Sequence, residues 1–158
     1  MRILILGAGL REQKPDDDNE YITLDIIGAP DVKHDMNSLP LPFDDNYFSE
    51  IWATHCLEHW GMQGDWRYFF EEWNEYYRIL KKDGMFRGIV PFGTWTWGDP
   101  GHTRVITNGT LAFLSRKQYE KQIGNTAMTD YRFIYKGDFE AIKLLVYDTE
   151  FVFWLKKI

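Results

Sequence analysis

The sequence predicts an α/β domain whose mostly parallel β-sheet ends in an antiparallel hairpin. Near the start, the apolar run at residues 3–6 stops at Gly-Ala-Gly (7–9), as a buried parallel strand does before a glycine-rich turn. Residues 66–81 repeat large apolar side chains at helical spacing. Two apolar segments, 141–147 and 150–155, are separated by Asp-Thr, which is typical of a hairpin. This order of elements favours helices packed on a central sheet.

The other strands of the first half follow at short intervals. Residues 21–25 and 31–35 each predict a strand that ends in aspartate, and residues 50–54 predict a fourth strand. Residues 38–46 contain two prolines and Asp-Asp-Asn, so we expect a loop there. A short helical segment is expected at 55–60.

The clearest helix is expected at residues 66–81. Asp65 is placed to cap its first turn, and Gly84 is placed to close its end. Residues 85–91 then predict the fifth strand. The following residues, 92–109, are rich in glycine, and a long loop of this kind is often functional.

A second helix is expected from Ser115 to about Ile123, because Ser115 and Gln118 have the spacing of a capping box. The sequence contains no internal repeat and no linker. We therefore expect residues 1–158 to form a single domain, within the usual size range of domains.

Composition narrows the classes of partner. The net charge is −6 and no basic block is present, which makes nucleic acid an unfavourable partner. No apolar run reaches the roughly 20 residues that span a membrane, and Cys56 is the only cysteine. We expect a cytoplasmic protein. Aromatic residues make up 17% of the chain, enough to line a ligand pocket or a homo-oligomer interface.

Polar features follow three successive strands. Gly7 and Gly9 allow a ligand to approach the backbone closely, although the dinucleotide-binding pattern lacks its third glycine because position 12 is Glu12. Asp25 is placed to accept hydrogen bonds from ribose hydroxyls, and Asp35 from an adenine amino group. Each aspartate alone is better explained as a solvated turn residue. Together they should converge at the carboxyl edge of the sheet, where open α/β sheets bind ligands.

Several motifs carry a resemblance to a known family. They are Leu-Gly-Ala-Gly at 6–9, Leu-Asp at 24–25, His-Asp-Met at 34–36, Leu-Pro-Leu-Pro-Phe-Asp-Asp-Asn-Tyr-Phe at 39–48, Ile-Trp-Ala-Thr-His-Cys-Leu-Glu-His at 51–59 and Arg-Ile-Leu-Lys-Lys-Asp-Gly at 78–84. With them, residues 2–91 resemble the Rossmann-like class I S-adenosylmethionine-dependent methyltransferases of the type 11 group. Two features depart from the family. Arg11 replaces its last glycine, and the first crossover is shortened.

The resemblance implies S-adenosylmethionine as cofactor, with its methionine portion above the glycine turn. It also implies that Asp25 binds the ribose, that Asp35 contacts the adenine beside Met36, and that Thr54 and His55 lie near the sulfonium. The complete set of expected cofactor-binding residues is Gly7, Ala8, Gly9, Asp25, Ile26, Asp35, Met36, Thr54 and His55.

Methyl transfer is an in-line displacement, so the main task of such an enzyme is alignment. A base is needed only when the acceptor must lose a proton. His55 and His102 are the candidate catalytic residues, whereas His59 is better explained as a structural cap. Cys56 is expected to be a small buried residue. No histidine or cysteine spacing indicates a metal site.

Four functions remain open from the sequence. The first is methyl transfer to a small-molecule or glycan-type acceptor. The second is S-adenosylmethionine binding without transfer, as a sensor, a degrading enzyme or a degenerate subunit. The third is a nicotinamide-dependent oxidoreductase, which the missing third glycine disfavours. The fourth is a pure interaction domain. No motif identifies the acceptor.

Overall fold

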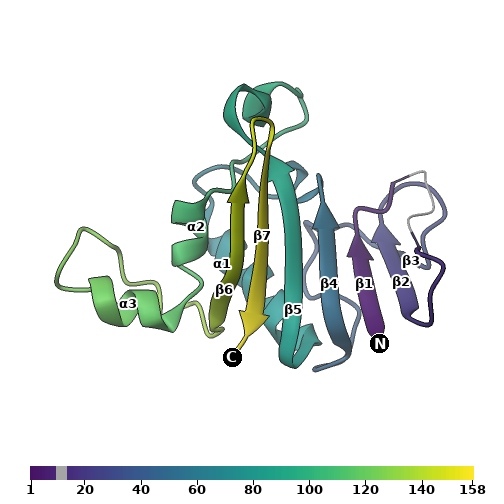
Figure 1. The fold of residues 1–158 in the computed structure, drawn as a ribbon, viewed down its shortest axis with the longest axis horizontal. Helices are drawn as coiled ribbons and strands as arrows, with labels where there is room; N and C mark the ends of the chain where they lie inside the picture. Colours follow the sequence, from purple (N-terminus) through teal and green to yellow (C-terminus); the bar gives the residue numbers. More distant parts are fainter. Residues whose placement is uncertain (10–13) are drawn as a thin grey trace.

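The computed structural model describes residues 1–9 and 14–158, and a single sheet dominates it (Figure 1). The strands are β1 (Arg2–Leu6), β2 (Glu20–Asp25), β3 (Val32–Lys33), β4 (Phe48–Thr54), β5 (Leu80–Pro91), β6 (Phe139–Val146) and β7 (Glu150–Lys157). The α-helices are α1 (Trp66–Ile79), α2 (Asn108–Ala112) and α3 (Arg116–Gln122), and the 3-10 helices are η1 (Leu57–His59) and η2 (Gly93–Trp97).

The seven strands lie in the order β3-β2-β1-β4-β5-β7-β6. The first five pair in parallel, and β7 pairs antiparallel with both β5 and β6. This arrangement confirms the predicted fold: a mostly parallel, Rossmann-like sheet with an antiparallel C-terminal hairpin. The strand order reverses between β1 and β4, and open α/β sheets bind ligands at such a point.

The main core lies between α1 and one face of the sheet (Figure 1). Trp73 of α1 has no exposed surface, and its ring lies 4.8 Å from that of Phe86 in β5. Tyr76 packs on the same Phe86 ring at 4.9 Å. The aromatic stripe of the predicted helix is therefore core, as its helical spacing indicates.

Cross-strand contacts cover part of the opposite face. The guanidinium of Arg87 lies 4.6 Å from the ring of Trp154 and 5.7 Å from that of Trp52. Glu50 accepts hydrogen bonds from Arg87 at 2.8 Å and from the indole of Trp52 at 2.6 Å. Lys143 lies 4.3 Å from Trp154 on its other side. These pairs link four neighbouring strands, and each adds cation–π or charge attraction to the sheet.

The end of the predicted helix at 66–81 was wrong by two residues. The helix stops at Ile79 because Leu80 turns into extended backbone and pairs with Phe48 of β4. Gly84 therefore does not close the helix but lies within β5. Sheet pairing here overrides the good helix propensity of Lys81 and Lys82, as tertiary contacts commonly do. The cap at the other end is confirmed, because Asp65 accepts a hydrogen bond from the backbone N–H of Tyr68.

The predicted loop at 92–109 contains more structure than its glycine content suggests. It includes η2 and the start of α2, whose first turn has a capping box formed by Thr107 and Thr110. The predicted box at Ser115 is wrong, since that side chain makes no capping hydrogen bond at the start of α3. In the described part of the chain, no helix combines the length and apolar character needed to cross a membrane.

Gly88 in β5 is the site of our first prediction. A Cβ at this position would lie 2.0 Å from Cζ of Phe153, the residue opposite it in β7, and this ring is fully buried. Gly88→Ala should therefore lower the free energy of unfolding by about 1–3 kcal/mol, the usual cost of overpacking. Urea unfolding measures this change in the free energy of unfolding. Gly109→Ala in α2 is the control, since its Cβ would meet only Thr107 Oγ1 at 3.6 Å. Equal effects of the two changes would contradict the packing argument.

Candidate functional site

The glycine turn after β1 is closely packed against the start of η1. Gly7 has a φ of +63°, and a Cβ there would lie 2.4 Å from Cβ of Cys56. Gly9 has a φ of +65°, and a Cβ there would meet no described atom within 4 Å. The two glycines therefore differ. Gly7 lets β1 and the end of β4 approach each other, while Gly9 has no such close neighbour among the described residues. Ala8 between them is buried, and Cys56 is buried as predicted.

Asp25, at the end of β2, is hydrogen-bonded to this glycine turn. One carboxylate oxygen accepts the N–H of Gly9 at 2.6 Å, and the other accepts the N–H of Ile27 at 3.0 Å. The fold thus brings together the glycine turn and the acidic strand end that the sequence predicted separately. Ile26, the next residue, is half exposed.

Asp35 and Met36 follow β3 and contact the segment before α1. Asp35 accepts the backbone N–H of Asn37 at 2.9 Å, and Asn37 in turn accepts the N–H of Gly61. The carbonyl of Met36 accepts the hydroxyl of Tyr68 at 2.7 Å. The side chain of Met36 is only 3% exposed, which leaves it little surface to present to a ligand.

Thr54 and His55 lie at the carboxyl end of β4. His55 has a φ of +49°, and its N–H donates to the carbonyl of Ile89 in β5. Its Nε2 lies 2.8 Å from a carboxylate oxygen of Glu150, and its Nδ1 lies 3.7 Å from Oε1 of Glu58. These two carboxylates, Glu58 foremost, raise the pKa of His55 to about 9. The ring is therefore an imidazolium at neutral pH.

His102 lies in the loop between η2 and α2. Its Nδ1 lies 2.7 Å from the carbonyl oxygen of Thr96, and its Nε2 lies 3.9 Å from Oε1 of Glu58. The ring packs edge-on against His59, with 4.9 Å between centroids. His55 and His102 are thus grouped around Glu58, a residue for which the sequence indicated no role. Spacing could not reveal this group, because His102 lies far from the others along the chain.

A buried ion pair holds the His102 loop against α1. The guanidinium of Arg104 donates to both carboxylate oxygens of Glu72, at 2.7 and 2.9 Å, and its Nε donates to the carbonyl of Leu57. Tyr76 also donates to Glu72, so every oxygen of this carboxylate has a partner. Arg104 is 4% exposed and Glu72 is fully buried.

A cavity of about 480 Å³ opens beside the histidines. It lies between the ends of β4 and β5, the loop around η2, and the turn between β6 and β7. Its lining residues are His55, Pro91, Trp95, Gly98, Asp99, Pro100, His102, Thr149 and Glu150. Both candidate catalytic histidines therefore line one cavity, together with Trp95.

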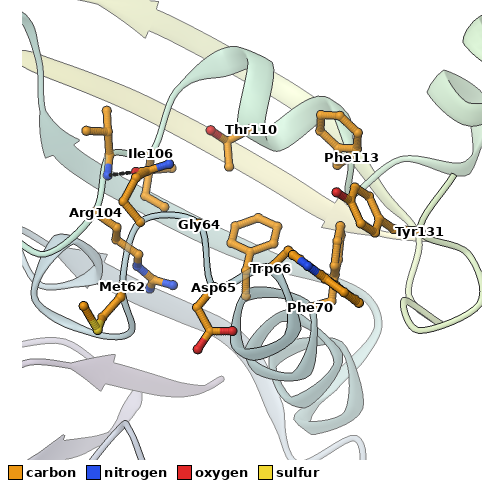
Figure 2. A pocket seen from close by; sticks show the side chains of 13 residues that line it. Met62, Gly64, Asp65, Trp66, Phe70, Arg104, Ile106, Thr110, Phe113 and Tyr131 are labelled. Atoms are coloured by element: carbon orange, nitrogen blue, oxygen red, sulfur yellow. Dashed lines mark hydrogen bonds between the residues drawn. The ribbon is translucent and has the colours of Figure 1, made fainter. Parts of the chain in front are cut away.

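Figure 2 shows a second cavity, of about 270 Å³, at the start of α1. One part of its wall is aromatic, with Trp66 and Phe70 from α1 near Phe113 and Tyr131. Arg104 lies at its other end. None of the predicted site residues lines this cavity, so it is separate from the histidine cluster.

Arg11 and Glu12, where the glycine pattern departs from the family, lie outside the described residues.

The spacing of histidine and cysteine indicated no metal site. The described residues nevertheless bring one possible ligand atom each from Glu58, His59 and His102 within 4.8 Å of one another.

Comparison with known proteins relates the chain to one fold. Residues 11–87 match the family model of the methyltransferase domain. No curated protein matches the sequence. Among solved structures, a SAM-dependent methyltransferase from Archaeoglobus fulgidus superimposes with a TM-score of 0.63 at 19% identity, covering 99% of this chain and 86% of that one.

Two further structures agree. A SAM-dependent methyltransferase from Aquifex aeolicus has a TM-score of 0.61 at 12% identity, covering 100% of this chain and 82% of that one. The 1,6-didemethyltoxoflavin-N1-methyltransferase of Burkholderia thailandensis, solved with 1,6-didemethyltoxoflavin and S-adenosylhomocysteine, has a TM-score of 0.58 at 14% identity. It covers 99% of this chain and 70% of that one. At these identities the likeness establishes a shared fold.

Proposed function

The chain has the class I methyltransferase fold and matches the methyltransferase domain family over residues 11–87. We propose that it is an S-adenosylmethionine-dependent methyltransferase acting on a small-molecule or glycan-type acceptor. The observation that carries this proposal is the junction of Gly9 and Asp25, where an acidic strand end meets a glycine turn at the reversal of strand order. A nucleoside cofactor is recognised in this place by folds of this kind.

The cofactor is proposed to lie across the ends of β1, β2 and β3. Gly7, Ala8 and Gly9 would pass beneath its methionine portion. Each oxygen of Asp25 accepts one backbone N–H, and the lone pairs that remain can accept the ribose hydroxyls. Ile26 would flank the ribose.

The adenine and the sulfonium define the two ends of the proposed cofactor site. Asp35 would accept the adenine amino group, and Met36 would contribute mainly backbone because its side chain is buried. Thr54 and His55 would lie beside the sulfonium. From there the methyl group would face the cavity of about 480 Å³. A single domain, residues 1–158, would hold both the cofactor and the methyl acceptor.

The acceptor is proposed to occupy that cavity. Its volume lies within the roughly 300–1,000 Å³ typical of small-molecule sites, and the didemethyltoxoflavin methyltransferase of the same fold holds a small acceptor. Of the two proposed catalytic histidines, His102 is the better placed to act as a base, because His55 is an imidazolium at neutral pH. The Nδ1 of His102 faces a carbonyl oxygen, which leaves the lone pair on Nε2. We expect this chemistry to take place in the cytoplasm.

Ligand-induced stabilisation tests the cofactor assignment. S-adenosylmethionine or S-adenosylhomocysteine at about 100 times its dissociation constant should add about 2.7 kcal/mol of stability, which a thermal melt detects. NAD is the control and should produce no shift. Stabilisation by NAD alone would favour an oxidoreductase and contradict the proposal. Cofactor binding with no methylated product across a panel of small alcohols, amines and glycans would favour binding without transfer.

A further inference from the structure

Glu58 is a buried carboxylate whose charge has no hydrogen-bonded partner among the described residues. Its side chain is 2% exposed, and neither oxygen accepts a hydrogen bond. The closest imidazole nitrogens, of His55 and His102, lie 3.7 and 3.9 Å from Oε1, too far for a hydrogen bond. The His55 ring is close enough to attract this charge, but it leaves both carboxylate oxygens without a hydrogen bond and therefore available as metal ligands.

Two histidines beside Glu58 are oriented as metal ligands are. Nδ1 of His59 lies 3.1 Å from the carbonyl oxygen of Gly101, and Nδ1 of His102 lies 2.7 Å from that of Thr96. A carbonyl oxygen only accepts, so each Nδ1 carries the proton and each Nε2 carries the lone pair. Metal-binding histidines are held in this way, with one ring nitrogen donating to a carbonyl or carboxylate.

We propose that Glu58, His59 and His102 bind a divalent transition-metal ion. One nitrogen or oxygen atom of each residue already lies within 4.8 Å of the others. Zinc bonds of about 2.0–2.2 Å at tetrahedral angles hold two ligand atoms roughly 3.3–3.6 Å apart, so the ligands must move inward by about an ångström. His59 is exposed, so its ring has room to make this movement. Two imidazoles and one carboxylate form the ligand set of catalytic zinc and of non-haem iron.

The proposed metal would lie at the wall of the cavity that His102 lines. Three protein ligands leave a coordination position open, which a water molecule or an oxygen of a bound molecule can take. The inference does not require methyl transfer, because it depends on these three side chains alone. It does compete with one detail of the proposed function: once its Nε2 binds a metal, His102 no longer accepts a proton.

Zinc titration of the chelator-treated full chain tests the site, with calorimetry for stoichiometry and a thermal melt for stability. We expect one zinc ion per chain and a higher melting temperature. Glu58→Gln and His102→Gln should each weaken binding by at least about tenfold, since even the groups that orient metal ligands contribute 10–100-fold. His34→Gln, which changes a histidine outside the cluster, should bind as the wild type does.

The zinc-induced change in stability gives an independent readout. Glu58→Gln keeps the side-chain shape but loses the attraction between Glu58 and the His55 ring in the chelated state, so the comparison is the rise in melting temperature on adding zinc, which should be smaller in the variant than in the wild type. If that variant fails to fold, His59→Gln on the exposed ring provides the second test and should also weaken binding. No zinc-dependent change in the wild type, or full zinc binding in both Glu58→Gln and His102→Gln, would overturn the proposal. S-adenosylhomocysteine binding is measured separately and does not bear on this result.

Discussion

Asp25→Asn is expected to weaken binding of S-adenosylhomocysteine by about ten- to a hundredfold. Hydrogen bonds to charged groups contribute about 1.5–3 kcal/mol, and asparagine offers one acceptor oxygen where the carboxylate has two. The remaining oxygen can still accept the N–H of Gly9, so the turn should keep its shape. Isothermal titration calorimetry measures the affinity, and a thermal melt of the unliganded variant checks the fold.

Asp31→Asn is the matched control for this change. Asp31 also accepts backbone and side-chain hydrogen bonds close to β2, from Thr23, and pairs with Lys14. It lies outside the proposed cofactor contacts. Its substitution should lower stability without changing affinity. If Asp25→Asn leaves the affinity for S-adenosylhomocysteine unchanged, or if both variants lose affinity equally, Asp25 does not bind the ribose.

Breaking the buried pair of Arg104 and Glu72 should have the largest effect on stability. Glu72→Leu or Arg104→Met leaves one buried charge without its partner, which typically costs about 3–5 kcal/mol. Urea unfolding at pH 7 measures the loss through the transition midpoint, provided that the slope stays constant. The loop carrying His102 should also loosen, because Arg104 ties it to Glu72 and Leu57.

The double variant Glu72→Leu, Arg104→Met separates the two explanations of such a loss. If the cost comes from an uncompensated charge, the double variant should recover most of it, since apolar replacements of buried ion pairs are often neutral. If each side chain contributes independently, the two losses should add. Additive losses would mean that the pair stabilises the loop by packing and not by charge compensation.

Much of the fold could be predicted from the sequence because its signals are local. The apolar run before Gly7 and the helical spacing of residues 66–79 each lie within one element, and both were confirmed. The end of α1 was wrong because pairing of Leu80 with a distant strand decides it. The capping box at Ser115 was wrong because the spacing of two residues does not ensure that their side chains meet.

In the candidate site, too, one part could be predicted from the sequence and another could not. Gly9 and Asp25 follow successive strands, so topology alone predicts their meeting, and the structure places them 2.6 Å apart. Their role toward a cofactor stays a prediction. The cluster around Glu58 has no such signal, because His102 reaches it through a loop whose path depends on the buried Arg104. No periodicity or spacing encodes that path.

The insertion of β7 between β5 and β6 has a consequence for synthesis on the ribosome. β6 is made before β7 but contacts the rest of the sheet only through it. Until residues 150–157 emerge, β5 remains an open edge with unpaired backbone groups, and β6 has no strand to join. Open edges of this kind invite pairing with other chains. The domain therefore completes its sheet in one late step, and a nascent chain stalled before β7 would be the form most in need of a chaperone.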